Sequence, residues 1–307
     1  MKIAVIGAGI SGLTCAYYLS RSHDVSVYES ADRIGGHTAT IDVEHGGRQY
    51  AVDTGFIVYN DWTYPNFIKL LNELNVDTRP SQMSFSVSCE ATGLEYAGSN
   101  LNSLFADRRN LYRVAYWQML RDILRFNREA IADLDADRIA QDATLGEYLS
   151  ARGYGKMFIE KYLVPMGAAI WSAGTDEMLQ FPLLFFVRFF KNHGLLSVKN
   201  RPQWHTIVGG SNSYLAPLTK AFAGRITTSA SITCIKRRQD GVTIESTDPR
   251  HGNRQQHFDV LIIATHSDQA LALLSDATAE EKSILGAIRP SRFAARISHM
   301  GTVIEYT

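Results

Sequence analysis

A glycine-rich turn near the N-terminus constrains the fold of this chain more than any other feature. Residues 2–12 read KIAVIGAGISG. A short apolar stretch there runs into the pattern G-x-G-x-x-G, formed by Gly7, Gly9 and Gly12. The stretch is typical of a strand buried in a parallel sheet, and the residues after the turn predict a helix. Glu29 ends the next apolar run, which completes the spacing of a dinucleotide-binding βαβ unit.

Each position of this turn has its own physical role. Gly7 permits the tight turn out of the strand, Gly9 lets the backbone approach a pyrophosphate, and Gly12 brings the helix close to the strand. The first helical turn, with Ile10 and Ser11, presents N–H groups and the positive end of the helix dipole to the phosphates. The alternative is a glycine-rich turn without a ligand, and the flanking strand, helix and acid make it the weaker interpretation.

The acid at the end of the second strand narrows the choice of nucleotide. The carboxylate of Glu29 can accept hydrogen bonds from a ribose 2′-hydroxyl, and it repels a 2′-phosphate. NADP is therefore disfavoured, and FAD and NAD both remain open from this unit alone.

Two later segments extend the nucleotide-binding pattern. The stretch ADRIGGHT follows Glu29, where Gly35 and Gly36 allow close backbone approach to a ligand and Arg33 supplies a cation near the phosphates. Residues 52–60, VDTGFIVYN, read as a strand that runs into a loop. Together these segments resemble the flavin amine oxidase superfamily, which also holds the phytoene desaturases and protoporphyrinogen oxidases. In that superfamily an R-x-G-G-x-T segment lies along the flavin diphosphate, and a D-x-G segment approaches the isoalloxazine.

The resemblance implies FAD as the cofactor and assigns its contacts by position. The implied cofactor-binding residues are Gly7, Gly9, Ile10, Ser11, Gly12, Glu29, Ser30, Arg33, Gly35, Gly36, His37, Thr38, Thr54, Gly55, Phe56 and Ile232. Ile232 is included because the first strand of the family's β-meander touches the adenine through backbone atoms. Amine oxidases usually have Arg where this chain has His37. This departure weakens the expectation of amine oxidation but not that of flavin binding.

The order of the patterns predicts an α/β fold in which one domain interrupts another. Residues 1–60 and 204–288 are expected to form a Rossmann-like FAD-binding domain with a β-meander. Residues 61–203 read mostly as helices and are expected to form an inserted substrate domain. Residues 289–307 form an atypical tail.

Local patterns predict individual elements. Residues 102–132 carry the periodicity of one long helix, and Thr144 with Glu147 predicts a capping box at the start of another. Residues 239–241, Gln-Asp-Gly, predict the turn of a hairpin in the meander. Residues 258–266 read as another buried parallel strand that ends over the cofactor.

The last residues depart from the family. Its members continue to a Gly-Asp or Gly-Glu that holds the ribityl and pyrophosphate, and this chain contains no Gly-Asp dipeptide. The apolar pattern ends after about Ile288, so the resemblance covers residues 1–288. A truncated or frameshifted reading frame is the preferred explanation, ahead of a redesigned C-terminus.

Composition and charge exclude other classes of protein. The chain has 31 basic and 31 acidic residues, which argues against a nucleic-acid partner. Cys15, Cys89 and Cys234 are widely spaced, so we expect reduced thiols in a cytoplasmic protein, with neither a disulfide framework nor a metal site. No apolar run of about 18 residues predicts a transmembrane segment. The phenylalanine-rich residues 181–190 could line a lipid tunnel or touch a membrane surface peripherally, and an ordinary buried helix is the favoured alternative.

The preferred function is that of an FAD-dependent oxidoreductase, in which flavin N5 takes a hydride from a C–N or C–C bond of a small or lipid-like substrate. No catalytic residue is assigned, since an activated substrate carbon needs no dedicated acid. His37 and His205 are candidates for moving protons, although a structural role is commoner for a single histidine. Desaturation is slightly favoured over amine oxidation. The alternatives are a catalytically impaired, truncated remnant and an NAD-binding dehydrogenase.

Overall fold

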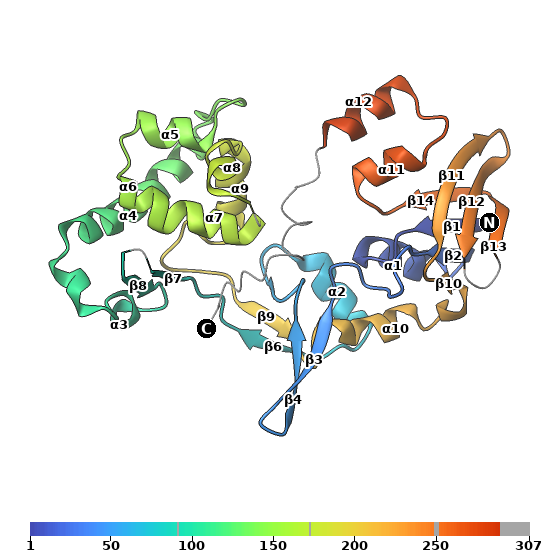
Figure 1. The fold of residues 1–307 in the computed structure, drawn as a ribbon, viewed down its shortest axis with the longest axis horizontal. Helices are drawn as coiled ribbons and strands as arrows, with labels where there is room; N and C mark the ends of the chain where they lie inside the picture. The colour runs from blue at the N-terminus through green and yellow to red at the C-terminus, as the bar shows by residue number, and fades with distance from the viewer. Residues whose placement is uncertain (91, 172, 249–251, 289–307) are drawn as a thin grey trace. The chain divides into compact units, whose positions relative to one another are not determined.

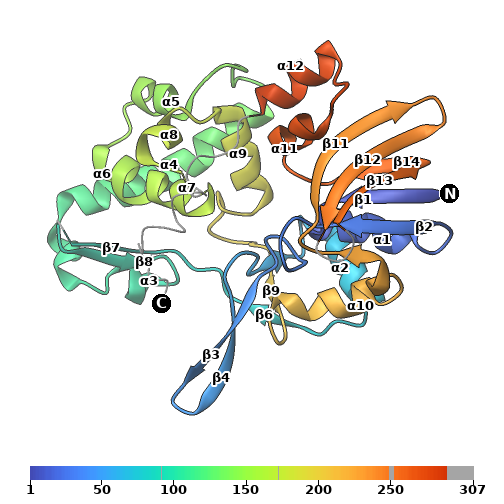
Figure 2. The ribbon, with the colours of Figure 1, turned by 45° about the vertical axis from the view of Figure 1, so that its right-hand side comes forward.

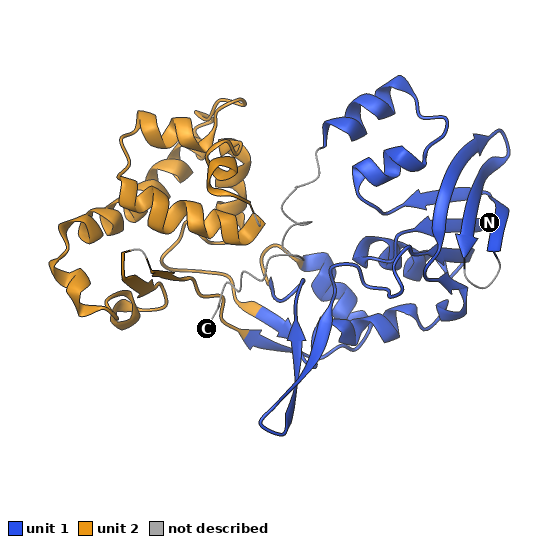
Figure 3. Ribbon diagram, viewed as in Figure 1, with its two compact units in different colours: residues 1–59, 65–80, 205–290 blue, residues 60–64, 81–204, 291–307 orange. Residues whose placement is uncertain are grey.

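The computed structural model describes residues 1–90, 92–171, 173–248 and 252–288 of the 307-residue chain. These residues form two compact units, shown in different colours in Figure 3. Unit 1 contains residues 1–59, 65–80 and the described part of 205–290, and unit 2 contains residues 60–64 and 81–204. The tail at residues 289–307 lies outside the described residues.

Unit 1 contains both strands and helices. They are β1 (Lys2–Ile6), α1 (Ile10–Leu19), β2 (Asp24–Tyr28), β3 (Thr40–His45), β4 (Arg48–Asp53), β5 (Tyr59–Asn60), α2 (Pro65–Glu73), β6 (Thr78–Ser81), β9 (Trp204–Ile207), α10 (Leu215–Thr219), β10 (Ile226–Thr227), β11 (Ser231–Arg238), β12 (Gly241–Asp248), β13 (Gly252–Phe258), β14 (Val260–Ile263), α11 (Ser267–Leu273) and α12 (Ala279–Ala287). Strands β5, β6 and β9 each extend by one residue into unit 2 and together form a small sheet in the order β5-β9-β6.

Unit 2 is mainly helical. Its elements are β7 (Ser86–Cys89), β8 (Leu94–Ala97), α3 (Leu101–Leu104), α4 (Val114–Asp135), α5 (Leu145–Ala151), α6 (Lys156–Phe158), α7 (Val164–Trp171), α8 (Thr175–Leu179) and α9 (Leu183–Asn192). A π-helical turn, Ile159–Leu163, joins α6 to α7.

A parallel sheet in the order β10-β2-β1-β14 organises unit 1 (Figure 1). Strand β1 lies inside this sheet, and its Ala4 and Val5 are fully buried. Ala4 and Ile6 belong to a core shared with the meander strands, and Val5 lies against Gly12 of α1. Because side chains alternate between the two faces of a strand, a strand covered on both faces must be apolar throughout. The β1–α1–β2 order predicted from the sequence is present.

Strand β14 differs from the buried strand predicted at residues 258–266. Among the described strands it pairs only with β1, so it lies at an edge of the sheet. Val260 is 39% exposed, and residues 261–263 are half-buried. Phe258 ends β13 instead and packs edge-to-face against Tyr28, with ring centroids 6.2 Å apart. The apolar run therefore supplies two elements, and the prediction of one long buried strand was wrong.

An antiparallel meander of β11, β12 and β13 packs against the parallel sheet (Figures 1 and 2). The predicted hairpin turn is confirmed, because Arg238 pairs with Gly241 across it. Ile235 and Ile244 are fully buried in the core between the two sheets. The register of β11 shifts between Ile232 and Cys234, which is a β-bulge.

The hairpin β3–β4 extends away from the parallel sheet in both ribbon views (Figures 1 and 2). Ile41 pairs with Val52 and Val43 with Tyr50, so these four side chains lie on one face of the hairpin. Each of them is at least 41% exposed. Sequence reasoning predicted no strand at residues 40–45.

Helix α2 belongs to unit 1, although the sequence-based division placed residues 65–80 in the insert. Its Glu73 accepts hydrogen bonds from the Arg21 guanidinium at 2.5 Å and from the Tyr18 hydroxyl at 2.8 Å, both on the α1 side of the unit. Its Phe67 packs edge-to-face on Tyr214, with ring centroids 5.8 Å apart. These contacts between distant segments have no signature in local periodicity.

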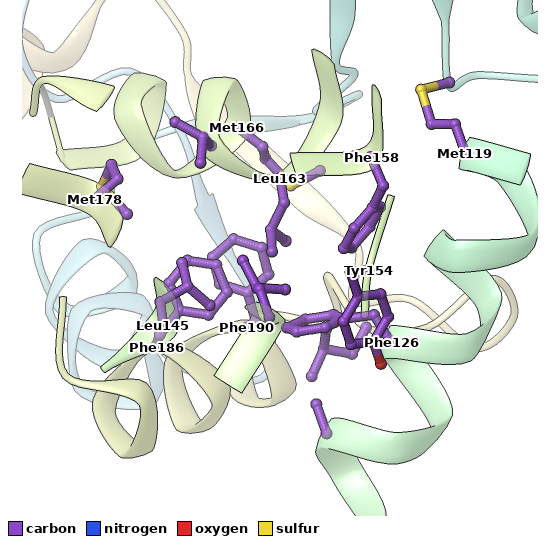
Figure 4. Packing of buried hydrophobic residues seen from close by; sticks show 14 of the residues in the cluster. Met119, Phe126, Leu145, Tyr154, Phe158, Leu163, Met166, Met178, Phe186 and Phe190 are labelled. Carbon is purple, nitrogen blue, oxygen red and sulfur yellow. The ribbon is translucent and has the colours of Figure 1, made fainter. Parts of the chain in front are cut away.

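Aromatic side chains fill the core of unit 2 (Figure 4). Phe126, Phe158, Phe186 and Phe190 are each at most 1% exposed. Helix α9 contributes two of them, which confirms that the phenylalanine-rich segment is a buried helix; of its phenylalanines only Phe185 is strongly exposed, at 54%.

Side-chain caps mark two helix starts in unit 2 that bear on the sequence predictions. The predicted capping box is confirmed, since the Glu147 N–H donates to Thr144 Oγ1 at 3.2 Å and the Thr144 N–H donates to the Glu147 carboxylate at 3.0 Å. The single helix predicted at residues 102–132 is wrong. Asp107 accepts from the Arg109 N–H and caps a 3-10 helix, Arg108–Tyr112, that separates α3 from α4.

Candidate cofactor site

The glycine-rich turn connects β1 to α1 and fixes the start of the site. Gly7 has a φ of +99°, and its N–H donates to the Tyr28 carbonyl at 2.8 Å, so the turn closes against the end of β2. A Cβ on Gly12 would lie 1.9 Å from the Gly7 carbonyl oxygen and 3.2 Å from Val5. Gly12 is therefore required by the internal packing of the turn and of α1 against β1, in agreement with its predicted role.

Gly9 has a different environment. It is the N-cap residue of α1, in an extended conformation, and a Cβ there would meet no atom within 4 Å. The first N–H groups of a helix have no intrahelical acceptor, so those of Ile10 and Ser11 need a partner outside the helix. Both residues are exposed. The turn thus presents open space beside helix N–H groups, which suits an anion.

A second glycine pair lies directly against this turn. The Gly35 N–H donates to the Ala8 carbonyl at 2.7 Å, and a Cβ on Gly36 would lie 3.2 Å from the Cα of Gly9. The Arg33 guanidinium donates to the Gly36 carbonyl at 3.0 Å and to the Thr38 carbonyl at 3.2 Å. Arg33 therefore braces the loop 35–38, which lies against Gly9.

Glu29 joins the turn to the loop that follows β2. Its Oε2 accepts from the Ala8 N–H at 2.7 Å, and its Oε1 accepts from the Ala31 N–H at 2.9 Å and from the Ser30 hydroxyl at 3.3 Å. The carboxylate is half-buried. Since each carboxylate oxygen has two lone pairs, Oε2 retains acceptor capacity for a ligand hydroxyl.

The Thr54–Phe56 segment packs on the paired-glycine loop. The Phe56 N–H donates to the His37 carbonyl at 3.0 Å, and the Thr54 N–H donates to the Ala39 carbonyl at 2.9 Å. A Cβ on Gly55 would lie 2.1 Å from the His37 carbonyl oxygen, so only glycine permits this approach. Hydrogen bonds thus bring together the two segments that carried the family resemblance.

Thr38 anchors the same loop to the interior. Its hydroxyl shares a hydrogen bond with the Tyr214 hydroxyl, and the two residues are 3% and 1% exposed. Burial raises the pKa of Tyr214, so the phenol stays neutral and able to donate.

Ile232 stands apart from this hydrogen-bonded set. It lies in β11, opposite Ser246, and its half-buried side chain packs against the core that contains Tyr28 and Ile235. The structure therefore gives Ile232 a packing role, and the adenine contact that the resemblance implies stays a prediction.

Asp53 connects several segments of the site through hydrogen bonds, and the sequence did not predict it as a site residue. Its Oδ1 accepts from the Thr40 hydroxyl at 2.7 Å and from both the N–H and the hydroxyl of Ser211 at 2.8 Å. It thereby ties the base of the β3–β4 hairpin to the turn at Gly209–Gly210. The D-x-G segment could have indicated this residue, because Asp53 directly precedes the predicted flavin contacts at Thr54–Phe56.

Two histidine stacks lie in unit 1. The rings of His37 and His266 are 6.3 Å apart and nearly parallel, and those of His205 and Tyr59 are 5.6 Å apart. His266 follows β14 and was not predicted as a site residue. Its position after the carboxyl end of a parallel strand is the signal that could have found it, because ligands of such sheets bind there.

The described residues contain no group of three or more His, Cys, Asp or Glu that could hold a metal ion. All three cysteines are free. No helix in the described part of the chain is long and apolar enough to cross a membrane.

A βαβ turn that is open at Gly9, a carboxylate at the end of β2 and a second glycine pair define the class of dinucleotide-binding α/β proteins. The family model described as flavin containing amine oxidoreductase matches residues 10–303, and the chain belongs to this family. FAD is the cofactor of the family. The NAD-binding alternative is not favoured by these findings.

Curated relatives include both amine oxidases and a desaturase. The chain is 25% identical over 266 residues to flavin-containing amine oxidase A of Canis lupus familiaris, covering 80% of this chain and 46% of the relative. It is 38% identical over 88 residues to 15-cis-phytoene desaturase of Synechococcus elongatus, covering 28% of this chain and 18% of the relative. The chain therefore spans about half the length, or less, of these relatives.

Solved structures share the fold. Cyclohexylamine oxidase from Brevibacterium oxydans IH-35A aligns with a TM-score of 0.66 at 17% identity, over 93% of this chain and 62% of that one. A CLA-producing fatty acid isomerase from P. acnes aligns with a TM-score of 0.57 at 18% identity, over 92% of this chain and 63% of that one. Such low identities establish the architecture alone.

Proposed function

We propose that unit 1 binds FAD along the turn 7–12 and the loop 35–38, and that the chain acts as an FAD-dependent oxidoreductase. The observation that carries the proposal is the open face of Gly9. Apart from its chain neighbours, no atom lies within 4 Å of a Cβ there. The first turn of α1 begins at the next residue, and the Gly35–Gly36 backbone lies against Gly9. A diphosphate needs both the space and the donors.

The residues around this face have separable roles. The N–H groups of Ile10 and Ser11 would donate to the diphosphate. Glu29, already fixed by two backbone N–H donors, would accept from a ribose hydroxyl. Arg33 would keep the loop in shape through its two carbonyl contacts, and its positive charge would lie near the phosphates.

Bound FAD would supply the acceptor for a hydride taken from a C–N or C–C bond. The contribution of this chain would be to hold the Thr54–Phe56 segment in place through the His37 and Ala39 carbonyls. The stacked rings of His37 and His266 would border the same loop.

For the substrate we propose an amine as the first candidate. The likeness to amine oxidases extends over 80% of the chain, whereas the likeness to the desaturase covers 28%. The phenylalanine-rich helix α9, which had favoured a lipid-like substrate, contributes its side chains mainly to the core of unit 2. Desaturation is the second candidate, because the desaturase segment has the higher identity and His37 departs from the usual amine-oxidase residue.

Anaerobic reduction of the bound flavin tests the proposal. Purified holoprotein would be mixed with a panel of primary and secondary amines, and separately with a detergent-solubilised polyene, while the visible flavin absorption is followed. Bleaching by an amine alone supports amine oxidation, and bleaching by the polyene alone supports desaturation. A yellow protein that no compound bleaches, yet dithionite does, would favour the catalytically impaired remnant.

A further inference from the structure

A cysteine and a lysine from distant parts of the chain meet in unit 2. Cys89 is the last residue of β7, and Lys161 is the middle residue of the π-helical turn between α6 and α7. The Lys161 ammonium donates to the Cys89 sulfur, with Nζ 3.4 Å from Sγ. Both residues are half-buried, so neither group is sealed from solvent.

The surroundings of Cys89 favour the thiolate. The side chain and backbone of Thr92, followed by the Lys161 ammonium, lower the pKa of the Cys89 thiol. The turn that places Thr92 there is closed by the Gly93 N–H, which donates to the Cys89 carbonyl at 2.8 Å. Thiolate character controls how fast a cysteine is oxidised.

Lys161 is held at two points by the same hairpin. The hydroxyl of Tyr96, in β8, donates to the Lys161 carbonyl at 2.6 Å, and Tyr96 is only 3% exposed. A π-turn leaves backbone groups outside the regular α-helical pattern, and here one of them receives a buried side-chain donor. The β7–β8 hairpin therefore fixes the backbone of Lys161 while Cys89 receives its ammonium.

A hollow of about 480 Å³ opens beside Lys161. It is lined by Thr92 and Lys161, together with Leu94, Met119 and Phe158. Hydrogen peroxide is small enough to enter this space beside Lys161, and the half-buried Cys89 side chain is itself partly open to solvent.

We propose that Cys89 and Lys161 form a peroxide-responsive pair that closes a covalent sulfenamide crosslink. The Cys89 thiolate attacks one oxygen of hydrogen peroxide, the O–O bond breaks, and hydroxide leaves a sulfenic acid on Sγ. That hydroxide takes a proton from the Lys161 ammonium and becomes water. The neutral amine then attacks Sγ and expels a second hydroxide, which takes a proton from nitrogen. One peroxide is reduced to two waters, and the sulfur and nitrogen are joined with the net loss of two hydrogen atoms.

The crosslink would connect β7 to the helical segment between α6 and α7 within unit 2. It requires no flavin chemistry on this chain, because added peroxide is the oxidant. If no crosslink forms, the proposal of an FAD-dependent oxidoreductase still stands. If the chain does not bind FAD, the crosslink proposal still stands.

Peptide mass spectrometry of the full chain after treatment with hydrogen peroxide tests the proposal. We expect a joined pair of peptides containing Cys89 and Lys161, lighter by two hydrogen atoms than the sum of the separate peptides and separated again by dithiothreitol. Cys234, also half-buried, is the control in the same molecule. Cys89 should react about tenfold faster than Cys234, since a stabilised thiolate is the reactive form.

Lys161→Arg is the matched variant, because it keeps the cation but not the nucleophilic amine. In this variant Cys89 should be trapped by dimedone as the sulfenic acid, and no joined peptide should form. The proposal is overturned if the wild-type chain yields only dimedone adducts at Cys89, or if Cys89 reacts no faster than Cys234.

Discussion

Gly9 and Gly12 belong to the same motif, but the structure predicts opposite consequences for adding one methyl group to each. At Gly9 a Cβ meets no atom within 4 Å, and the backbone angles of φ −77° and ψ −179° suit alanine. Replacing an N-cap glycine by alanine costs about 0.5–1 kcal/mol. The Gly9→Ala apoprotein should therefore be nearly as stable as wild type, while its methyl group occupies the space proposed for the diphosphate.

At Gly12 the same methyl group would lie 1.9 Å from the Gly7 carbonyl oxygen. Overpacking of this kind costs about 1–3 kcal/mol or more, and the helix propensity of alanine returns about 1 kcal/mol. We expect Gly12→Ala to lower the free energy of unfolding by about 2 kcal/mol, through a shift of the turn or of α1.

The assay is urea unfolding of both apoproteins, followed by circular dichroism, together with FAD titration followed by quenching of flavin fluorescence. Gly9→Ala should lose about tenfold or more in FAD affinity, equivalent to about 1.4 kcal/mol, with little change in unfolding. Normal FAD affinity of Gly9→Ala, or an unfolding loss equal to that of Gly12→Ala, would refute the assignment of the open face.

Three further substitutions test other parts of the structure. Glu29→Gln should lower the free energy of unfolding of the apoprotein by about 1–2 kcal/mol, since an amide replaces a carboxylate that accepts two backbone N–H bonds, and unchanged urea unfolding would contradict this. Tyr214→Phe removes the buried hydroxyl that pairs with the Thr38 hydroxyl and should cost about 1–2 kcal/mol in the same assay; a neutral effect would show that the bond contributes nothing. Burial alone would raise the pKa of Asp133, but hydrogen bonds from Tyr148 and Arg138 keep it below its ordinary value. The stabilisation that ionised Asp133 contributes is therefore fully present when the pH is above the ordinary pKa of aspartate. It is lost as the pH falls through the lowered pKa of the folded protein. Asp133→Asn should cost about 2 kcal/mol at neutral pH and less in acid, and a pH-independent loss in urea unfolding would be inconsistent with this linkage.

Local patterns predicted the parts of this fold that local chemistry determines. The turn 7–12, the capping box at Thr144 and the hairpin turn at residues 239–241 each depend on a few neighbouring residues, and each is present. The prediction of one long helix at residues 102–132 was wrong for a related reason. A capping aspartate, Asp107, competes with helix periodicity and interrupts it.

Contacts between distant segments were beyond local patterns. The hydrogen bonds of Asp53 to Ser211 and the packing of α2 on α1 depend on where the fold brings the chain back, and neither has a periodic signal. The exposure of β14 is a similar case. Its apolar residues match a buried strand, but burial depends on having neighbours on both sides, which the composition of one strand does not reveal.

The central claim is that the open face at Gly9 and the loop at Gly35–Gly36 hold FAD. The most direct test is to denature the purified protein and identify the released nucleotide by chromatography and absorption, with Gly9→Val purified in parallel. We expect FAD from the wild-type chain and little or none from Gly9→Val. Release of NAD without flavin, or equal FAD content in the two proteins, would contradict it.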